Sequence, residues 1–149
     1  MPLPERAQLP AVRYDRGMTK DCPFIFLILA ISTGAACGAV LRYLLSLWLN
    51  PKLSFLPAGT LLCNLTGAFL IGLISAYLSH KTGISPYTKL FLITGFLGSL
   101  TTFSTFSLES VNLILHGDPY RTLCHMLLHL AGSVILAFAG IILGKRIFY

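Results

Sequence analysis

Charge is the scarcest property of this chain. Of its 149 residues, 11% are charged and only 5 are Asp or Glu, whereas about 25% of residues are charged in typical globular domains. Hydrophobic residues make up 55% and the mean hydropathy is +0.78, so too few polar side chains remain to cover a surface in water. This composition excludes a disordered chain, a small secreted protein and almost any cytosolic enzyme. It predicts an integral membrane protein.

Clustered cysteines and basic stripes are absent as well. The four cysteines, Cys22, Cys37, Cys63 and Cys124, lie far apart and no two form a C-x-x-C pair, so they favour neither a disulfide framework nor a zinc site. The formal net charge is +6, but Lys and Arg lie mainly in the N-terminal tail and between apolar segments, as in membrane proteins. We expect a lipid bilayer as the partner and no nucleic acid.

Four apolar segments dominate the rest of the chain. Each approaches the roughly 20 residues that a helix needs to cross the hydrocarbon core, and the predicted spans are residues 24–48, 59–78, 90–115 and 122–144. Short connections rich in turn-forming residues separate them. The prediction is an all-α membrane protein with a flexible tail over residues 1–23 and one four-helix transmembrane domain over residues 24–149.

An even number of spans places both ends of this domain on one side of the membrane. Eight Lys or Arg residues fall on that side and three on the other, or five against three if the chain starts at Met18. So small a bias orients a protein weakly, and insertion in one or both directions stays open. Whether residues 1–17 are translated stays open too.

The third span is the least typical of a helix in lipid. Residues 95–110 contain two glycines and eight hydroxyl or carboxyl side chains in sixteen positions. Gly95, Gly98 and the threonines at 101 and 102 suggest one alternative, a helix that is broken midway, whose freed carbonyls would make a cation site. The alternative is a bent but continuous helix whose hydroxyls bond back to the preceding turn. The spacing alone does not decide between them.

Two aromatic residues follow within this span. Phe103 and Phe106 are three positions apart and share a helix face. Such a pair is usually plain packing, but Ser104 and Thr105 lie between them, and electropositive ring edges beside hydroxyl donors would hold a small anion. Glu109 is the one carboxylate inside a predicted span, and it lies on the same side of the helix.

Polar residues are rare in the first two spans. Asn64 stands in the middle of the second span, where its amide would either donate to an anion or join two helices. Arg42, near the end of the first span, would reach the membrane surface by extending its side chain. Glycines at 34 and 38, and again at 140 and 144, predict close helix contacts.

The fourth span carries His125, His129 and Ser133 at four-residue intervals, one polar stripe on an apolar helix. Interhelical hydrogen bonds are the simplest role, or a water-facing position for His125. Two histidines at i and i+4 are also a metal-ligand pair, although no HExxH carboxylate or cysteine accompanies them. No positioned base and nucleophile can be assembled at membrane depth, so we expect no catalytic residues and no enzyme.

Three motifs together resemble the CrcB/Fluc family of small fluoride channels. They read GxxxGAxxRY over residues 34–43, GTLxxNxxGxFxxG over residues 59–72 and GxxGxxTTFSTF over residues 95–106. The third motif is highly specific, and all three occur in order. The resemblance implies a channel that passively exports fluoride across the cell inner membrane and so lowers fluoride toxicity. It also implies an antiparallel, dual-topology homodimer with a broken third helix.

The same resemblance implies roles by position. Backbone carbonyls of Gly98 and Thr101 would hold a structural sodium ion (Na+) at the dimer centre, and Arg42 would lie near the pore mouth. The fluoride pore would be lined by Asn64, Phe103, Phe106, Ser104, Thr105, Glu109, His125, His129 and Ser133.

The fourth span departs from the family pattern, which usually offers a tyrosine and two serines where this chain has His125, His129 and Ser133. A neutral imidazole still donates one hydrogen bond, and a protonated one attracts an anion. We therefore hypothesise a pH-sensitive conductance through His129. Equal flux in wild type and His129→Ser between about pH 5.5 and 8 would exclude it.

Two other classes of protein share the four-span architecture. A small multidrug exporter would need a glutamate in the first span, which has none, so Glu109 would have to serve instead. A non-transporting membrane subunit would show no ion flux after purification.

Overall fold

The computed structural model describes residues 22–52, 55–81 and 83–148, so the predicted tail lies almost wholly outside the described residues. Within them, four helices are long and apolar enough to cross a membrane: Phe24–Lys52, Ala58–His80, Pro86–Leu115 and Pro119–Phe148. The prediction of an all-helical protein with four spans is confirmed. The last two spans begin earlier than predicted because Pro86 and Pro119 occupy first helical positions, where a missing N–H is tolerated.

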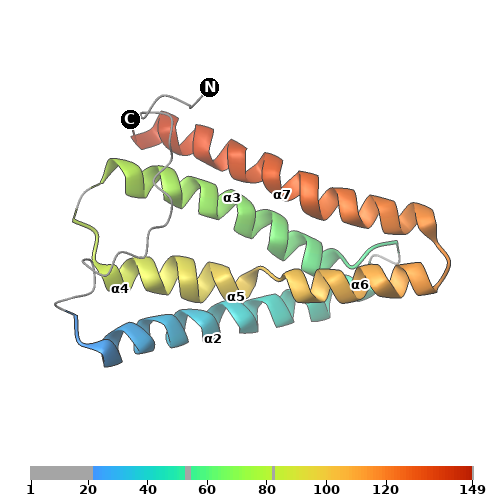
Figure 1. The fold of residues 1–149 in the computed structure, drawn as a ribbon, viewed down its shortest axis with the longest axis horizontal. Coiled ribbons are helices and arrows are strands. Elements are labelled where there is room, and N and C mark those ends of the chain that lie inside the picture. Colours follow the sequence, from blue (N-terminus) through green and yellow to red (C-terminus); the bar gives the residue numbers. More distant parts are fainter. Residues whose placement is uncertain (1–21, 53–54, 82, 149) are drawn as a thin grey trace, which may run out of the picture.

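The helices lie side by side in an elongated bundle (Figure 1). Its elements are α2 (Phe24–Leu49), the 3-10 turn η2 (Asn50–Lys52), α3 (Ala58–His80), α4 (Pro86–Lys89), the π-helix η3 (Leu90–Leu97), α5 (Gly98–Leu100), α6 (Phe103–Leu115) and α7 (Pro119–Phe148). The third span is thus composite, running from α4 to α6. The two main packing pairs are α3 with α7, and α2 with η3 and α5.

The backbone between α5 and α6 is not helical. Thr101 and Thr102 are extended, with ψ of 150° and 123°, and Figure 1 shows no helical turn there. In a continuous helix the Thr102 N–H would donate to the Gly98 carbonyl, but it donates to Asn64 Oδ1 at 2.7 Å. Thr102 then caps α6, because its hydroxyl accepts the Thr105 N–H at 3.2 Å.

Small residues bring the backbones close in both packing pairs. An added Cβ at Gly34 would collide with the Phe91 carbonyl, and one at Gly140 with the Phe69 carbonyl. The second glycine of each predicted pair is buried as well. These contacts confirm the close helix packing expected from the spacing.

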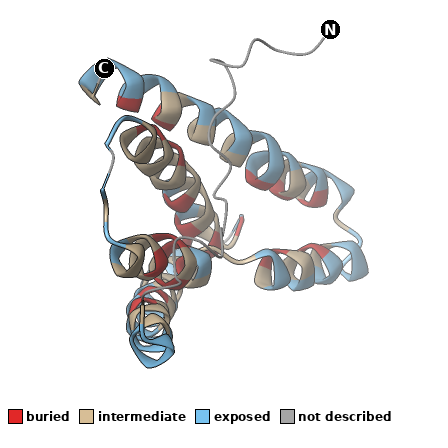
Figure 2. Cartoon of the chain, turned by 60° about the vertical axis from the view of Figure 1, so that its left-hand side comes forward, coloured by how far each residue is buried: buried red, intermediate tan, exposed pale blue. Residues whose placement is uncertain are grey.

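The outer faces of the bundle are apolar. Exposed residues follow the outward sides of the helices in Figure 2, while buried ones face the neighbouring helices. The exposed large hydrophobic side chains are mostly Leu, Ile, Val and Phe, which suits contact with lipid. The four cysteines are free.

Candidate functional site

An open groove of about 460 Å³ lies between α3, the third span and α7. Residues from three spans that are distant in sequence meet there. Seven of the predicted site residues line it: Asn64, Gly98, Thr101, Phe103, Phe106, His129 and Ser133.

Asn64 holds the non-helical backbone of the third span. Its Oδ1 accepts the Thr102 N–H at 2.7 Å, and its Nδ2 donates to the Thr102 carbonyl at 3.0 Å. Nδ2 also lies 3.0 Å from His129 Nδ1. The amide therefore joins three spans, which is one of the two roles that the sequence left open for it.

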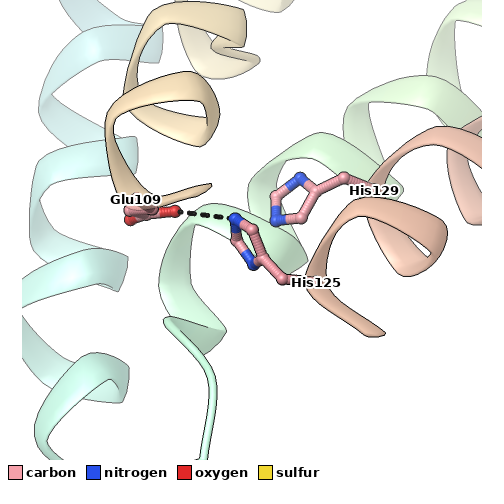
Figure 3. A group of neighbouring side chains, drawn as sticks. All are labelled: Glu109, His125 and His129. Carbon is pink, nitrogen blue, oxygen red and sulfur yellow. Dashed lines mark ion pairs between the residues drawn. The ribbon is translucent and has the colours of Figure 1, made fainter. Parts of the chain in front are cut away.

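Three titratable side chains, two of them buried, form a cluster, which Figure 3 shows, and one of them, His129, is in contact with this amide. We call these three residues the imidazole cluster: Glu109, His125 and His129. His125 is 0% exposed and His129 is 4% exposed, so the alternative in which His125 faces water is wrong. His125 Nε2 lies 3.7 Å from Glu109 Oε2.

The imidazole cluster has the residue types of a metal site. One candidate ligand atom from each residue lies within 4.8 Å of the others, and two histidines with one carboxylate are a known ligand set for zinc. By ligand type and spacing these residues could hold a metal ion. Four buried atoms of the cluster have no hydrogen-bond partner in the part of the chain that the structure describes: Glu109 Oε2, both ring nitrogens of His125, and His129 Nε2.

Phe106 covers both imidazoles. Its ring centroid lies 5.3 Å from that of His125 and 4.7 Å from that of His129. Phe103 is next to it at 5.5 Å, but Phe106 is buried whereas Phe103 is 73% exposed. The two aromatic residues are thus in contact, with one ring inside the chain and the other at its surface.

Glu109 is positioned from α3. Thr60 Oγ1 donates to Glu109 Oε1 at 2.6 Å. Glu109 also lines a second groove, of about 410 Å³, together with His116 and Arg121. Since His129 lines the first groove, the imidazole cluster lies between the two grooves.

The remaining predicted residues lie outside this cluster. Arg42 Nε donates to the Ser99 carbonyl at 3.0 Å, so its guanidinium is tied to the third span. The hydroxyls of Ser104 and Thr105 lie 3.1 Å from the Thr102 hydroxyl. Both therefore belong to the cap of α6.

Sequence reasoning missed the parts that Thr60 and Thr102 play as hydrogen-bond partners. Thr60 precedes Asn64 by four residues, so the helix period could have placed both on one face of α3. Thr102 has the residue type and position of a helix N-cap. Neither signal indicates which residue is the hydrogen-bond partner.

Comparison with known proteins gives a consistent result. The family described as CrcB-like protein, Camphor Resistance (CrcB), matches residues 29–141. A protein of Nitrosospira multiformis is 46% identical over 121 residues, which cover 81% of this chain and 94% of the relative. A protein of Pseudomonas aeruginosa is 47% identical over 114 residues, covering 76% and 90%. Both relatives are named fluoride-specific ion channel FluC.

Proposed function

The chain belongs to the CrcB family, and we propose that it is a fluoride-selective ion channel of the cell inner membrane. It is a multi-pass membrane protein with four spans, and its relatives are channels, not enzymes. The observation that carries the proposal is the groove in which an amide, two aromatic rings, an imidazole and a hydroxyl from three spans meet.

The groove offers the groups that a fluoride ion needs. Fluoride is small and strongly hydrated, so a narrow path must replace its water with hydrogen-bond donors. The ring edges of Phe103 and Phe106 are electropositive, and Ser133 adds a hydroxyl. Both Nδ2 hydrogens of Asn64 are directed at Thr102 and His129, so direct contact of Asn64 with the ion requires one of these bonds to exchange.

The proposed sodium site lies where α5 ends and the extended backbone begins, at the carbonyls of Gly98 and Thr101. Backbone carbonyls suit a hard cation, and the Gly98 carbonyl lacks its helical donor because the Thr102 N–H bonds to Asn64. Gly98 is exposed, and the nearest atom to an added Cβ is the Ile93 carbonyl oxygen at 3.5 Å. Gly98 and Thr101 fit the ion, but one chain supplies only these two carbonyls, so a second copy would complete its ligands.

A homodimer also accounts for the exposed side of the groove. Phe103 is 73% exposed and Val134 is 71% exposed, and both line the groove beside Gly98. A second, antiparallel copy would cover this side with the same residues. The small charge bias between the two sides of the membrane is compatible with such dual insertion.

Transport through this protein would be passive. Within the described spans Glu109 is the only carboxylate, so the first span lacks the acid of a proton-coupled exporter. An inside-negative potential of about 100 mV is worth about 2.3 kcal/mol per charge, which holds a monovalent anion roughly 50-fold lower inside. That gradient would expel fluoride that had entered as its neutral acid.

Ion efflux from liposomes that hold the purified protein tests the function. We expect fast fluoride efflux, read with a fluoride electrode, and no chloride efflux. Phe103→Ile and Asn64→Asp should lower the rate about tenfold or more. Leu127→Ile is the matched control, because Leu127 is 55% exposed on the outer side of α7. A folded protein without fluoride flux would contradict the proposal and favour a non-transporting subunit.

A further inference from the structure

We infer that Asn64 fixes the proton of the neutral His129 ring on Nε2, and that this Nε2–H is a binding site for fluoride within the imidazole cluster. The inference rests on the proposed channel function and deepens it by assigning one donor atom. It concerns a position where this chain has a histidine in place of the usual residue of the family.

The orientation of the Asn64 amide is decided by the backbone of the third span. A peptide N–H only donates and a peptide carbonyl only accepts. The Thr102 N–H lies 2.7 Å from Asn64 Oδ1, and the Thr102 carbonyl lies 3.0 Å from Nδ2. Exchanging the oxygen and nitrogen of the amide would set donor against donor and acceptor against acceptor. The amide therefore has one orientation.

This orientation makes His129 Nδ1 an acceptor. One Nδ2 hydrogen of Asn64 is directed at the Thr102 carbonyl and the other at His129 Nδ1, 3.0 Å away. Nδ1 must then offer its lone pair. Because a neutral imidazole carries a single ring proton, that proton is on Nε2. His129 Nε2 is buried and has no hydrogen-bond partner among residues 22–52, 55–81 and 83–148.

The unpartnered donor lies between the two grooves. His129 lines the first groove and Glu109 the second, and the ring centroids of His125 and His129 are 4.4 Å apart. Two ionisable groups face His129, namely Glu109 and His125. A carboxylate and a neutral imidazole that share one added proton carry no net charge as a pair. A buried N–H without a partner is costly, and a small anion on the path between the grooves would accept from it.

The same proton opposes a metal ion at this nitrogen. A metal binds the lone pair of a ring nitrogen, and Nε2 has none while Nδ1 accepts from Asn64. A zinc ion would have to remove the Nε2 proton or displace the Asn64 amide. Fluoride needs neither change, so the anion is the occupant that the hydrogen bonds favour.

Nitrogen NMR locates the proton directly. We would label wild-type protein with 15N-histidine in lipid nanodiscs and identify the His129 signals by their loss in His129→Gln, with His80→Gln as the control. We expect the Nε2–H form in wild type and the Nδ1–H form in Asn64→Asp, whose carboxylate accepts from the ring. Sodium fluoride should shift the Nε2–H signal, whereas sodium chloride should not.

Three results of this experiment would overturn the inference. The first is an Nδ1–H ring in the wild-type protein. The second is an Nε2–H signal that fluoride does not shift. The third is an Nε2–H signal that zinc chloride removes, which would assign the imidazole cluster to a metal. The spectra are read without ion flux, so they stand apart from any failure of the proposed channel function.

A pair of substitutions tests the same donor by flux. Glutamine at position 129 can place an amide nitrogen near the site of Nε2, whereas asparagine reaches only the site of Nδ1. We expect His129→Gln to keep fluoride efflux within about threefold of wild type and His129→Asn to lose about tenfold or more, the worth of one hydrogen bond to a charged group. Equal losses in the two variants would contradict the inference. No flux from wild type would instead contradict the channel function.

Discussion

The two halves of the third span are held in place by different contacts. Before the extended threonines, η3 and α5 lie on α2 with backbone against backbone, and a Cβ on Gly95 would come 2.6 Å from the Ile31 carbonyl oxygen. After them, α6 is held by side chains, with Phe106 over two imidazoles and Glu109 on the Thr60 hydroxyl. Toward α2 the first half leaves no room for even a methyl group at Gly95, while the second half has buried polar atoms without hydrogen-bond partners among the described residues. One span thus combines a rigid support with a chemically open site.

The backbone contact of the first half can be broken by one methyl group. Gly95→Ala would place a Cβ 2.6 Å from the Ile31 carbonyl oxygen and 3.0 Å from Gly34 Cα. Since backbone cannot yield as a side chain does, we expect a loss of about 3 kcal/mol in the free energy of unfolding. Thermal denaturation in detergent measures it. Gly132→Ala is the control, because its Cβ would meet only the tip of the Leu65 side chain. An equal loss of stability in Gly132→Ala would show that the backbone contact at Gly95 is no more restrictive than a side-chain contact.

The junction of the two halves depends on the Asn64 amide. Asn64→Ala removes two hydrogen bonds to Thr102 and one contact with His129. We expect a loss of about 2 kcal/mol in stability, because the Thr102 N–H and carbonyl are left without partners. Thr66→Ala is the control in the same helix, since the Thr66 hydroxyl bonds only within α3. Equal melting temperatures for the two variants would show that the junction does not need the amide.

Much of this arrangement could be predicted from the sequence, because apolar length and glycine spacing are local signals. Asn64, Phe106 and His129 were singled out as polar or aromatic residues of membrane spans. The bond between Asn64 and the Thr102 backbone could not be predicted, since it depends on how α3 crosses the third span. The bond of Arg42 to the Ser99 carbonyl also depends on tertiary packing, because Gly38 lies one turn earlier and its missing side chain brings α5 within reach of the guanidinium.

The second half of the third span, α6 with the imidazole cluster, should respond to pH, whereas the first half should not. Histidine is the side chain that ordinarily changes charge between about pH 5 and 8. A protonated His129 would attract fluoride, but burial of the ring and the Asn64 N–H at Nδ1 oppose its protonation. We therefore expect wild-type efflux to be nearly constant between about pH 8 and 5.5 and to increase only at lower pH, and His129→Ser to show no increase. Protein-free liposomes give the leak of the neutral acid. A proton on His129 Nδ1 would also be opposed to the Asn64 N–H that donates to this nitrogen. The increase in efflux should therefore be accompanied by a change in the NMR signals of the Asn64 amide.

The smallest effect on the chain itself is expected at Gly98, where the first half of the third span is exposed at the surface of the chain. The nearest atom to an added Cβ is 3.5 Å away, so Gly98→Ala should change the stability of the folded chain by less than about 0.5 kcal/mol. In the proposed homodimer the same face is covered, and the dimer fraction should fall. Light scattering after size-exclusion chromatography reports the mass. An unchanged dimer with unchanged flux would place the interface elsewhere.

The extended threonines have a further, electrostatic consequence. A continuous span exposes the ends of its helix dipole only at the membrane surfaces, where water screens them. The interruption adds a carbonyl end after Leu100 and an amide end at Phe103, in the middle of a span where the dielectric constant is low. Partial charges of opposite sign therefore face each other across two residues. An ion at this depth meets a field that comes from the peptide backbone and that no count of charged side chains describes.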